Sequence, residues 1–362
     1  MVQQLADIEY FHLCKELNHT LVNSRINKIY QIGENLFKFN FNTSSEVGEG
    51  KVSLLISLPD YLTLSKRVLT TPEKPSSFVM NLRKYLDNAR LISIEQPSLE
   101  IIFIFNMYAQ GSEMKLIFEM FSKGNILLID SNNKIVFTYR KEIWKDREVK
   151  RGLDYVFPPS KKSCFNISKE DFNLNGKNTI MAGILSKISL APKYLEYIIL
   201  STGENPKSES FSEDSIHKII SKVNEFKEIN LFYTYGETEK ELSLIKLNKE
   251  NEKQFDKITE AIDYVYEPSF QENKVKSKIK DKSIKLEEHL SKQLDEHKIE
   301  HDNTIKKAEF IYENYNKVEY VLNYVNSLIE KGMSEKEINN ILEKNKMNVD
   351  LKEKKVKIKV VI

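Results

Sequence analysis

Apolar positions in the first half of the chain change from a helical to an alternating spacing. Over residues 3–24 they recur near the helical period, which predicts a helix, at Leu5, Ile8, Leu13, Leu17 and Leu21. Alternating runs then predict strands at 25–32, 35–41, 51–58, 91–96, 101–107, 115–121 and 126–130, with a helix at 75–88. Because no crossover helices alternate with the strands, the pattern favours an antiparallel sheet over a doubly wound parallel one.

The pattern changes again after residue 159. Residues 168–226 hold short helical periods and predict a small helical bundle, with breaks at Gly176, Gly183, Pro192 and Gly203. Residues 231–247 are typical of a hairpin, and residues 255–266 predict one more helix. The chain is therefore expected to be α+β, with the sheet placed before the helices.

The longest uninterrupted pattern lies between Pro268 and Gly332. The 63 residues between them contain no glycine and no proline. A continuous helix of that size would reach about 95 Å, which is too long for burial in its own core. The prediction is an arm that reaches across or along something large.

One stretch of the arm carries a heptad pattern. From residue 308 to 329, apolar side chains fall at a and d spacing and predict a coiled-coil seam, at Ala308, Ile311, Tyr315, Val318, Leu322, Val325 and Ile329. Such a seam needs a partner. An intramolecular coiled coil and self-association of two chains are both open.

Composition narrows the class of protein. The 362 residues are 40% apolar and 30% charged, yet the formal net charge is only +2, so local charge has to carry any nucleic-acid argument. Cys14 and Cys164 fit no metal spacing and no disulfide framework, which favours a reducing cytoplasm. No apolar stretch approaches the roughly 20 residues of a membrane span, and the N-terminus lacks a signal-peptide pattern. We expect a soluble, cytoplasmic protein without a membrane partner.

The candidate chemistry is a local basic patch. Residues 139–162 interleave Tyr139, Trp144, Tyr155 and Phe157 with cations, of which the central ones are Arg140, Lys141, Lys145, Arg147, Lys150 and Arg151. Basic groups beside aromatic rings suit a surface that follows an RNA backbone. A solvated loop whose aromatic rings belong to the core explains the same composition. Catalytic constellations, metal-ligand sets and cofactor motifs are absent from the sequence, and Asp7 is most simply a carboxylate that stabilises a helix N-terminus.

Several motifs, in order along nearly the whole chain, resemble the NFACT family of ribosome-associated quality-control factors. Residues 75–91 (PSSFVMNLRKYLDNARL) resemble its signature helix, and residues 118–130 (FEMFSKGNILLID) its strand–Gly-Asn–strand signature. Shorter matches are 6–7, 25–30, 152–155 with the following prolines, 260–264 and 311–315. The combination is more specific than any one of these motifs.

The resemblance implies an architecture. It implies an N-terminal, mostly antiparallel α/β domain similar to that of DNA glycosylases at 1–165, a helix–hairpin–helix domain at 168–226 and a returning segment at 227–267. A coiled-coil arm would follow at 268–345, and residues 346–362 would begin an RNA-binding module whose remainder is absent.

The resemblance also implies partners and site residues. The family binds large ribosomal subunits that carry a stalled nascent chain on tRNA and recruits aminoacyl-tRNA, typically for alanine, for template-free tailing of that chain. The ribosome does the chemistry, so the chain is not expected to be an enzyme. The implied tRNA-binding residues are Asp7, Arg83, Lys84, Arg90, Glu100, Lys123 and Asn125. An Asp-Arg pair of the family is replaced here by Glu100-Ile101, which loses the guanidinium.

Other functions remain as alternatives. A DNA-glycosylase-like enzyme is one, although Val2, Gln3 and Gln4 after Met1 offer neither the N-terminal proline nor the adjacent glutamate of that chemistry. A general RNA-binding protein without tailing activity is another. An adhesin role, suggested by an old family label, fits poorly with the absence of an export signal and of disulfides.

Overall fold

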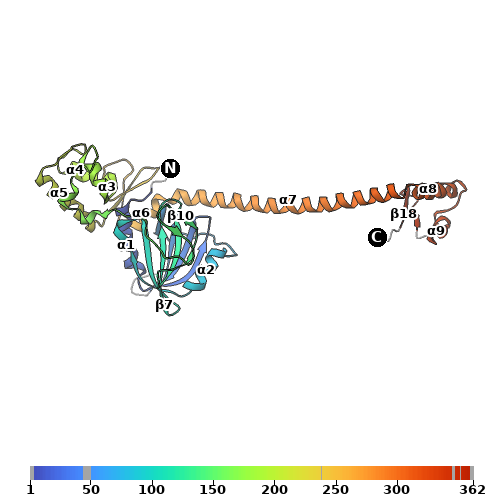
Figure 1. The fold of residues 1–362 in the computed structure, drawn as a ribbon, viewed down its shortest axis with the longest axis horizontal. Coiled ribbons are helices and arrows are strands. Elements are labelled where there is room, and N and C mark those ends of the chain that lie inside the picture. Colours follow the sequence, from blue (N-terminus) through green and yellow to red (C-terminus); the bar gives the residue numbers. More distant parts are fainter. Residues whose placement is uncertain (1–3, 44–49, 238, 345–346, 351, 359–362) are drawn as a thin grey trace. The chain divides into compact units, whose positions relative to one another are not determined.

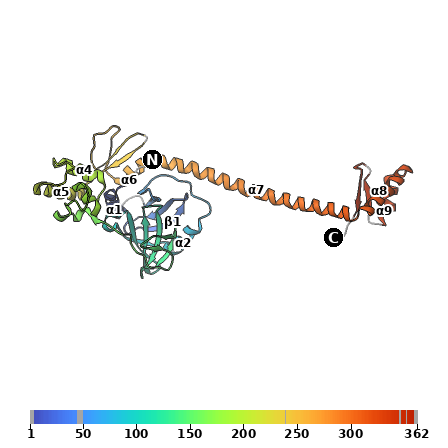
Figure 2. The same cartoon turned by 45° about the horizontal axis from the view of Figure 1, so that its top comes forward.

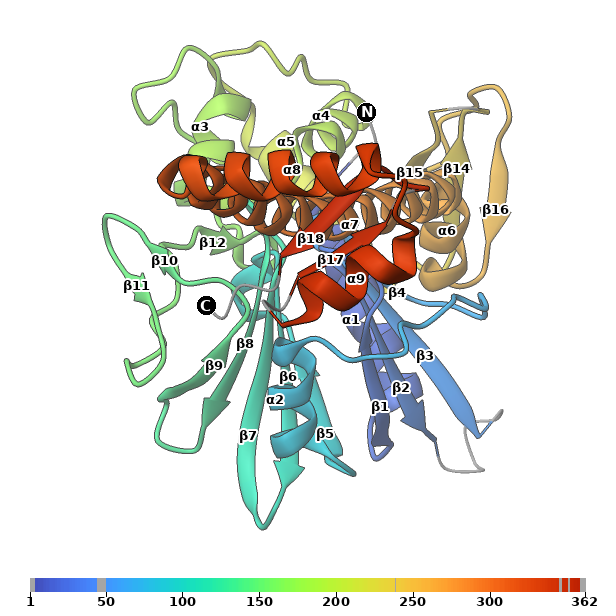
Figure 3. The same cartoon turned by 90° about the vertical axis from the view of Figure 1, so that its right-hand side faces the viewer.

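A nine-stranded antiparallel sheet is the centre of the first part of the computed structural model. Every neighbouring pair of strands is antiparallel. The order across the sheet is β4 (Tyr61–Leu64), β3 (Lys51–Ser57), β2 (Leu36–Asn42), β1 (Arg25–Gln31), β5 (Arg90–Glu95), β6 (Ile102–Ala109), β7 (Ser112–Glu119), β8 (Asn125–Asp130) and β9 (Ile135–Thr138) (Figure 3). The predicted antiparallel sheet and the α+β class are confirmed.

The structure describes residues 4–43, 50–237, 239–344, 347–350 and 352–358, and for 268–289, 357 and 358 it describes the backbone only. The first three and last four residues, on which the predicted start of the first helix and the end of the predicted segment 346–362 fall, lie outside this description. Contacts divide the chain into two units, Met1–Ser277 and Lys278–Ile362. The domain boundaries inside the first unit stay a prediction. Among the described residues, no helix combines the length and the apolar character that a membrane crossing requires.

Two helices pack on the sheet. Helix α1 (Asp7–Leu21) begins four residues later than predicted, because Ala6 is still extended. Helix α2 (Ser77–Leu86) begins where the Ser76 hydroxyl accepts a hydrogen bond from the Val79 amide, as an N-cap. The two helices contribute buried apolar side chains to one core with β2 and β6, including edge-to-face ring pairs Tyr10–Phe103 and Phe37–Phe78.

The two faces of β6 serve two cores. Phe103 and Phe105 belong to the main core, whereas Ile102 and Ile104 belong to a second, smaller core, as strand alternation requires. Val149 and Tyr155 pack into that second core. Val149 comes from a short hairpin of β10 (Glu142–Ile143) and β11 (Glu148–Val149).

A helical group follows the sheet and lies at one side of the first unit in Figure 1. Its elements are β12 (Lys162–Ser163), η2 (Cys164–Asn166), η3 (Lys169–Asp171), α3 (Ile180–Lys187), β13 (Ile188–Ser189), α4 (Pro192–Ser201), α5 (Glu213–Glu225) and η4 (Phe226–Glu228). The small helical bundle was predicted, but Gly183 does not break a helix. It lies inside α3, where a Cβ atom would meet the Asn173 carbonyl oxygen at 2.0 Å.

A second small sheet leads to the long helix. Strands β14 (Phe232–Tyr235), β15 (Glu241–Ser243) and β16 (Lys253–Phe255) form an antiparallel sheet beside α6 (Ile258–Val265) (Figure 2). This confirms the predicted hairpin and adds a third strand. Helix α7 (Glu267–Glu313) then runs for 47 residues.

The predicted continuous arm ends at Asn314, where the backbone leaves the helical region (φ −111°, ψ 20°). Helix α8 (Tyr315–Glu330) follows, then α9 (Glu335–Glu343) and a hairpin of β17 (Met347–Asp350) and β18 (Lys355–Ile358). Because Asn314 is neither glycine nor proline, the absence of those residues could not predict this break.

The predicted seam is only partly right. Val325 is buried, but it packs with the off-seam residue Leu328 against α9 and β17 of the same chain. The other large seam residues are 40–57% exposed, namely Ile311, Tyr315, Leu322 and Ile329. Part of the heptad pattern therefore encodes packing on a local C-terminal element. Pairing of the arm with a second chain stays a prediction.

Leu328 gives a test of this packing. We expect Leu328→Ala to destabilise the second unit by about 2–3 kcal/mol, because a buried leucine in a small cluster is removed. Hydrogen exchange at the β17 amides should then speed up. Leu322→Ala, on the same helix but exposed, is the matched control and should leave exchange unchanged. Equal effects of the two substitutions would contradict this packing.

Candidate functional site at the start of the first helix

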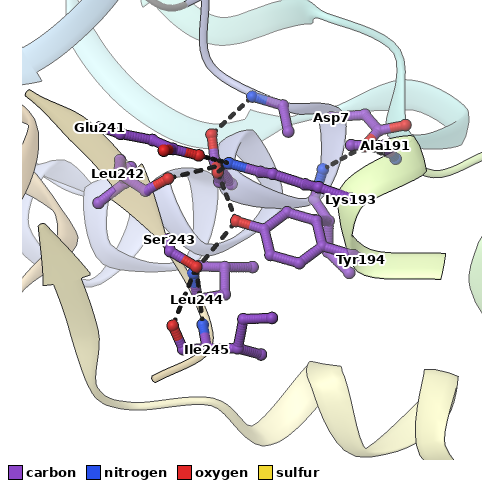
Figure 4. Close-up of polar contacts among 12 residues, drawn as sticks. Asp7, Ala191, Lys193, Tyr194, Glu241, Leu242, Ser243, Leu244 and Ile245 are labelled. Atoms are coloured by element: carbon purple, nitrogen blue, oxygen red, sulfur yellow. Dashed lines mark hydrogen bonds and ion pairs between the residues drawn. The ribbon is translucent and has the colours of Figure 1, made fainter. Parts of the chain in front are cut away.

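Asp7 joins the beginnings of two helices. Its Oδ1 atom accepts hydrogen bonds from the Ile8 amide (2.8 Å) in α1 and from the Ala191 amide (3.1 Å), which directly precedes α4 (Figure 4). Both helix N-termini carry partial positive charge, which favours a carboxylate there. The predicted role at a helix N-terminus is thus only part of what Asp7 does, since it also binds a segment 184 residues away.

The surroundings of Asp7 oppose its negative charge. Burial raises the pKa of the Asp7 carboxyl to about 6, the two amide hydrogen bonds lower it by less, and Glu9 and Glu100 raise it further. Among the described residues, no cation forms an ion pair with Asp7. A carboxylate kept in such surroundings is typical of a functional site rather than of a stabilising contact.

Glu9 is the centre of a buried polar network next to Asp7. Its side chain is fully buried and accepts hydrogen bonds from Lys193 Nζ (2.8 Å), from the Tyr194 hydroxyl and from the Ala6 amide (2.6 Å). Lys193 also donates to the Leu242 carbonyl oxygen, and the Tyr194 hydroxyl accepts from the Leu244 amide (Figure 4). The network fixes α4 and the β15 region to the start of α1.

Sequence reasoning missed this network, although a signal was present. Leu5 and Leu13 belong to the apolar stripe of the first helix. Glu9 lies on the same stripe, four residues from each of them. A glutamate on a buried stripe needs a charged or hydrogen-bonding partner. The sequence could have flagged Glu9, but it could not have identified Lys193 as the partner.

Glu100 lies beside Asp7. Gln96 donates from Nε2 to the Asp7 carbonyl oxygen (2.9 Å) and to the Glu100 carbonyl oxygen (3.0 Å). Glu100 Oε1 accepts from the Lys161 amide (3.2 Å). The structure therefore brings together two of the predicted site residues that are far apart in sequence.

Lys123 is at the same edge of the sheet. It is exposed in the turn between β7 and β8. Met120, at the start of that turn, donates its amide to the Ile101 carbonyl oxygen (2.9 Å) and accepts from Gln4 Nε2 (3.1 Å). These bonds place the start of the turn next to the segment that precedes β6, and tRNA binding by Lys123 stays a prediction.

Three other predicted residues lie elsewhere. Arg90 pairs with Arg25 across β5 and β1, next to the C-terminal end of α1, whereas Asp7 is at the N-terminal end. Arg83 donates from Nε to the Ile29 carbonyl oxygen (2.9 Å) and lies over the Tyr30 ring. Lys84 is exposed on α2. The structure does not bring Arg83, Lys84 or Arg90 to the Asp7 site.

Asn125 needs a correction, since it is buried and bonded within the protein. Its Nδ2 atom donates to the Arg140 carbonyl oxygen, and its Oδ1 atom accepts from the Arg140 amide (both 2.9 Å). Arg140 itself donates to the Asn35 side chain and to the Gly124 carbonyl oxygen. Asn125 holds β8 to the segment after β9, and its burial keeps it from the surface that a ligand would contact.

Arg147 also needs a correction. Its side chain is 3% exposed and forms a bidentate ion pair with Glu119, at 2.6 and 3.1 Å. Glu119 also accepts from the Tyr155 hydroxyl (2.9 Å). The alternative in which the aromatic rings belong to the core therefore holds for Tyr155, and Arg147 is buried with it. The RNA-binding surface stays a prediction. Lys141, Lys145, Lys150 and Arg151 are exposed.

The chemistry of the Asp7 site follows from its donors and acceptors. Two half-buried carboxylates accept hydrogen bonds and repel phosphate. They suit N–H groups such as the exocyclic amines of nucleobases. Within the described part of the chain, no three histidine, cysteine, aspartate or glutamate side chains are grouped as metal ligands.

Two solved structures have a fold similar to that of this chain. A fibrinogen-binding protein from Staphylococcus aureus has a similar structure over 72% of this chain and 98% of its own (TM-score 0.60, 18% identity). The N-terminal part of a fibronectin/fibrinogen-binding protein from Streptococcus suis is similar over 73% of this chain and 100% of its own (TM-score 0.55, 22% identity). At these identities the likeness establishes a shared fold.

The family is shown by sequence. Residues 8–359 match the family described as NFACT N-terminal and middle domains, so the chain belongs to the NFACT family. The predicted resemblance is confirmed.

Similar curated proteins carry ribosome quality-control names. The archaeal Rqc2 homolog aRqcH of Methanocaldococcus jannaschii is 27% identical over 96% of this chain and 55% of its own length. Ribosome quality control complex subunit 2 of Saccharomyces cerevisiae is 27% identical over 62% of this chain and 22% of its own length. The Rqc2 homolog RqcH of Bacillus subtilis is 24% identical over 75% and 50%. The chain thus spans about half the length, or less, of these relatives.

Proposed function

We propose that the chain acts in ribosome-associated quality control. In this role it belongs to a cytoplasmic protein that binds large ribosomal subunits carrying stalled peptidyl-tRNA, and it recruits aminoacyl-tRNA for template-free tailing of the nascent chain. Peptide-bond formation is left to the ribosome, so the chain acts by binding and not as an enzyme. Membership of the NFACT family and the names of the relatives support this role.

The observation that carries the proposal is the pairing of Asp7 with Glu100. Gln96 bridges the main-chain carbonyl oxygens of the two residues, and the Asp7 carboxylate lies at the N-termini of α1 and α4. Lys123 is exposed in the turn between β7 and β8. We propose that the two carboxylates accept hydrogen bonds from nucleobase or amine N–H groups of the tRNA, while Lys123 neutralises a phosphate.

Co-sedimentation tests the role. Full-length protein should sediment with dissociated large subunits, and sequencing of the bound fraction should show tRNA enriched over free RNA. Enrichment of subunits without tRNA would favour an RNA-binding protein that does not recruit tRNA. Absence of both enrichments would contradict the proposal.

Ile101 offers a gain-of-binding prediction. The family's Asp-Arg pair is replaced here by Glu100-Ile101, and Ile101 is half-buried. We expect Ile101→Arg to strengthen tRNA binding about tenfold, because a guanidinium adds charge-assisted hydrogen bonds to phosphate. Ile101→Met controls for loss of the branched side chain. Filter binding with labelled tRNA measures the effect, and equal affinities of the two variants would show that this position does not contact tRNA.

A further inference from the structure

The β10–β11 hairpin and the segment after it expose four apolar side chains. Ile143 is 84% exposed, Trp144 40%, Val156 53% and Phe157 47%. We call these four residues, together with Lys145, Lys150 and Arg151, the hairpin surface. Exposed aromatic rings beside cations are unusual in a surface that has no partner.

The two apolar pairs belong to one surface because Arg147 connects them. Its carbonyl oxygen accepts from the Trp144 amide (2.8 Å), and its Nη1 atom donates to the Val156 carbonyl oxygen (3.1 Å). The Phe157 ring packs edge-to-face against Tyr155, with centroids 5.0 Å apart. Residues on both sides of the hairpin turn are thereby held next to the 155–157 segment.

The hairpin surface is anchored to the interior of the protein. Arg147 and Tyr155 converge on the buried Glu119 carboxylate, and Arg147 lies 5.5 Å from the Phe121 ring. This anchor fixes the turn that carries Trp144 and Lys145. A binding surface held in one conformation loses less entropy when a ligand binds.

The cations of the surface are available. Among the described residues, Lys141, Lys145 and Arg151 form no ion pair, and Lys150 has only a distant one with Glu148, at 3.9 Å. Nearby acids are Glu142, Asp146 and Glu148, of which Glu142 accepts from Trp144 Nε1 (3.3 Å). Unpaired cations around an exposed indole ring complement a ligand that carries both negative charge and a planar ring.

We propose that the hairpin surface binds single-stranded RNA. The Trp144 indole stacks on a nucleobase, Phe157 supplies a second apolar contact, and Lys145, Lys150 and Arg151 neutralise phosphates. Single-stranded RNA suits this surface better than a duplex does, because the faces of duplex bases are already stacked on one another and cannot reach the indole ring. The inference deepens the proposed function by adding an RNA contact separate from the Asp7 site.

Trp144 itself reports the contact, because it is the only tryptophan of the chain. Titration of the full chain with a twelve-nucleotide oligouridine should quench its fluorescence. Raised salt should reverse the quenching, with a slope of about −0.7 per phosphate neutralised. A duplex RNA of the same length should quench much less. Lack of quenching by the single strand would overturn the inference.

Variants separate stacking from charge. Labelled oligouridine should bind Trp144→Leu about 5- to 150-fold more weakly than the unmodified chain. Removal of Lys145, Lys150 and Arg151 together, each replaced by alanine, should reduce the salt slope by about 2. Tyr197→Leu on α4 and Lys115→Ala on β7 are matched exposed controls. Circular dichroism melting shows whether each variant is folded, and equal binding by folded Trp144→Leu and its control would contradict the proposal.

The outcome can be separated from that of the proposed function. Co-sedimentation with large subunits and tRNA without quenching of Trp144 would contradict the hairpin contact and leave the proposed function in place. Quenching of Trp144 by RNA without such co-sedimentation would support the hairpin contact and contradict the proposed function. A chain that binds a ribosomal protein through Trp144 and does not respond to RNA would also overturn the assignment of the hairpin surface to RNA.

Discussion

Replacement of Arg147 by methionine is expected to destabilise the first unit by about 3–5 kcal/mol. The substitution leaves the Glu119 carboxylate, whose side chain is 1% exposed, without its cation. Burial alone would lower the pKa of the Arg147 guanidinium, but the hydrogen bonds and charge of Glu119 outweigh it and raise that pKa. Urea unfolding monitored by circular dichroism measures the loss.

A double variant distinguishes a lost charge partner from lost packing. Arg147→Met combined with Glu119→Gln removes the buried charge while an amide oxygen still accepts from Tyr155. It should recover about 1–2 kcal/mol relative to Arg147→Met alone. Lys145→Met, at an exposed cation two residues away, should change stability by less than about 0.5 kcal/mol. Similar losses for Lys145→Met and Arg147→Met would contradict the buried ion pair.

Asp7→Asn is expected to stabilise the protein while it weakens tRNA binding. Asn Oδ1 can accept both hydrogen bonds that Asp7 Oδ1 accepts, from Ile8 and Ala191, without burying a charge. The folded-state pKa of about 6 lies roughly two units above the unfolded value, so the gain at pH 7.5 should be about 1–3 kcal/mol. A stabilising substitution at a functional site is the expected sign of a charge kept for function.

The pH dependence of this gain has a definite sign. Below about pH 4 the carboxyl of Asp7 is protonated in the folded and unfolded states, so the variant and the wild type should be equally stable. Between pH 4 and 6 the wild type loses stability relative to Asp7→Asn, and above pH 6 the difference is constant. Urea unfolding at pH 4, 5, 6 and 7.5 measures it. Asp87→Asn, which removes an exposed charge at the end of α2, is the control. A gain that does not vary with pH would contradict the burial of a charged Asp7.

The sequence predicted the sheet well because its signals are local. Alternation located seven strands to within a few residues, and the antiparallel arrangement followed from the missing crossover helices. Strands β4 and β9 were missed, because each has only four residues and follows directly on a turn. Short segments carry too few periods for the pattern to be recognised.

The candidate site was less predictable, because its partners are distant in sequence. Arg147 was counted with the exposed cations since the sequence gives no sign that Glu119, 28 residues earlier, pairs with it. Asn125 was assigned to tRNA from a motif, whereas its hydrogen bonds bind it to Arg140. Asp7 and Glu100 were each assigned to tRNA binding through the family resemblance, which did not predict that they lie side by side. Which side chains meet is decided by the tertiary fold, which local patterns do not contain.

Recovery of tRNA with large subunits by wild-type protein and by Asp7→Asn tests the central claim most directly. Both proteins should co-sediment equally with the subunits at pH 7.5. The variant should retain at least about tenfold less tRNA per subunit, because hydrogen bonds to a charged acceptor are lost. Asp87→Asn should behave as the wild type does. Equal tRNA retention by wild type and a folded, more stable Asp7→Asn variant would contradict the assignment of this site to tRNA.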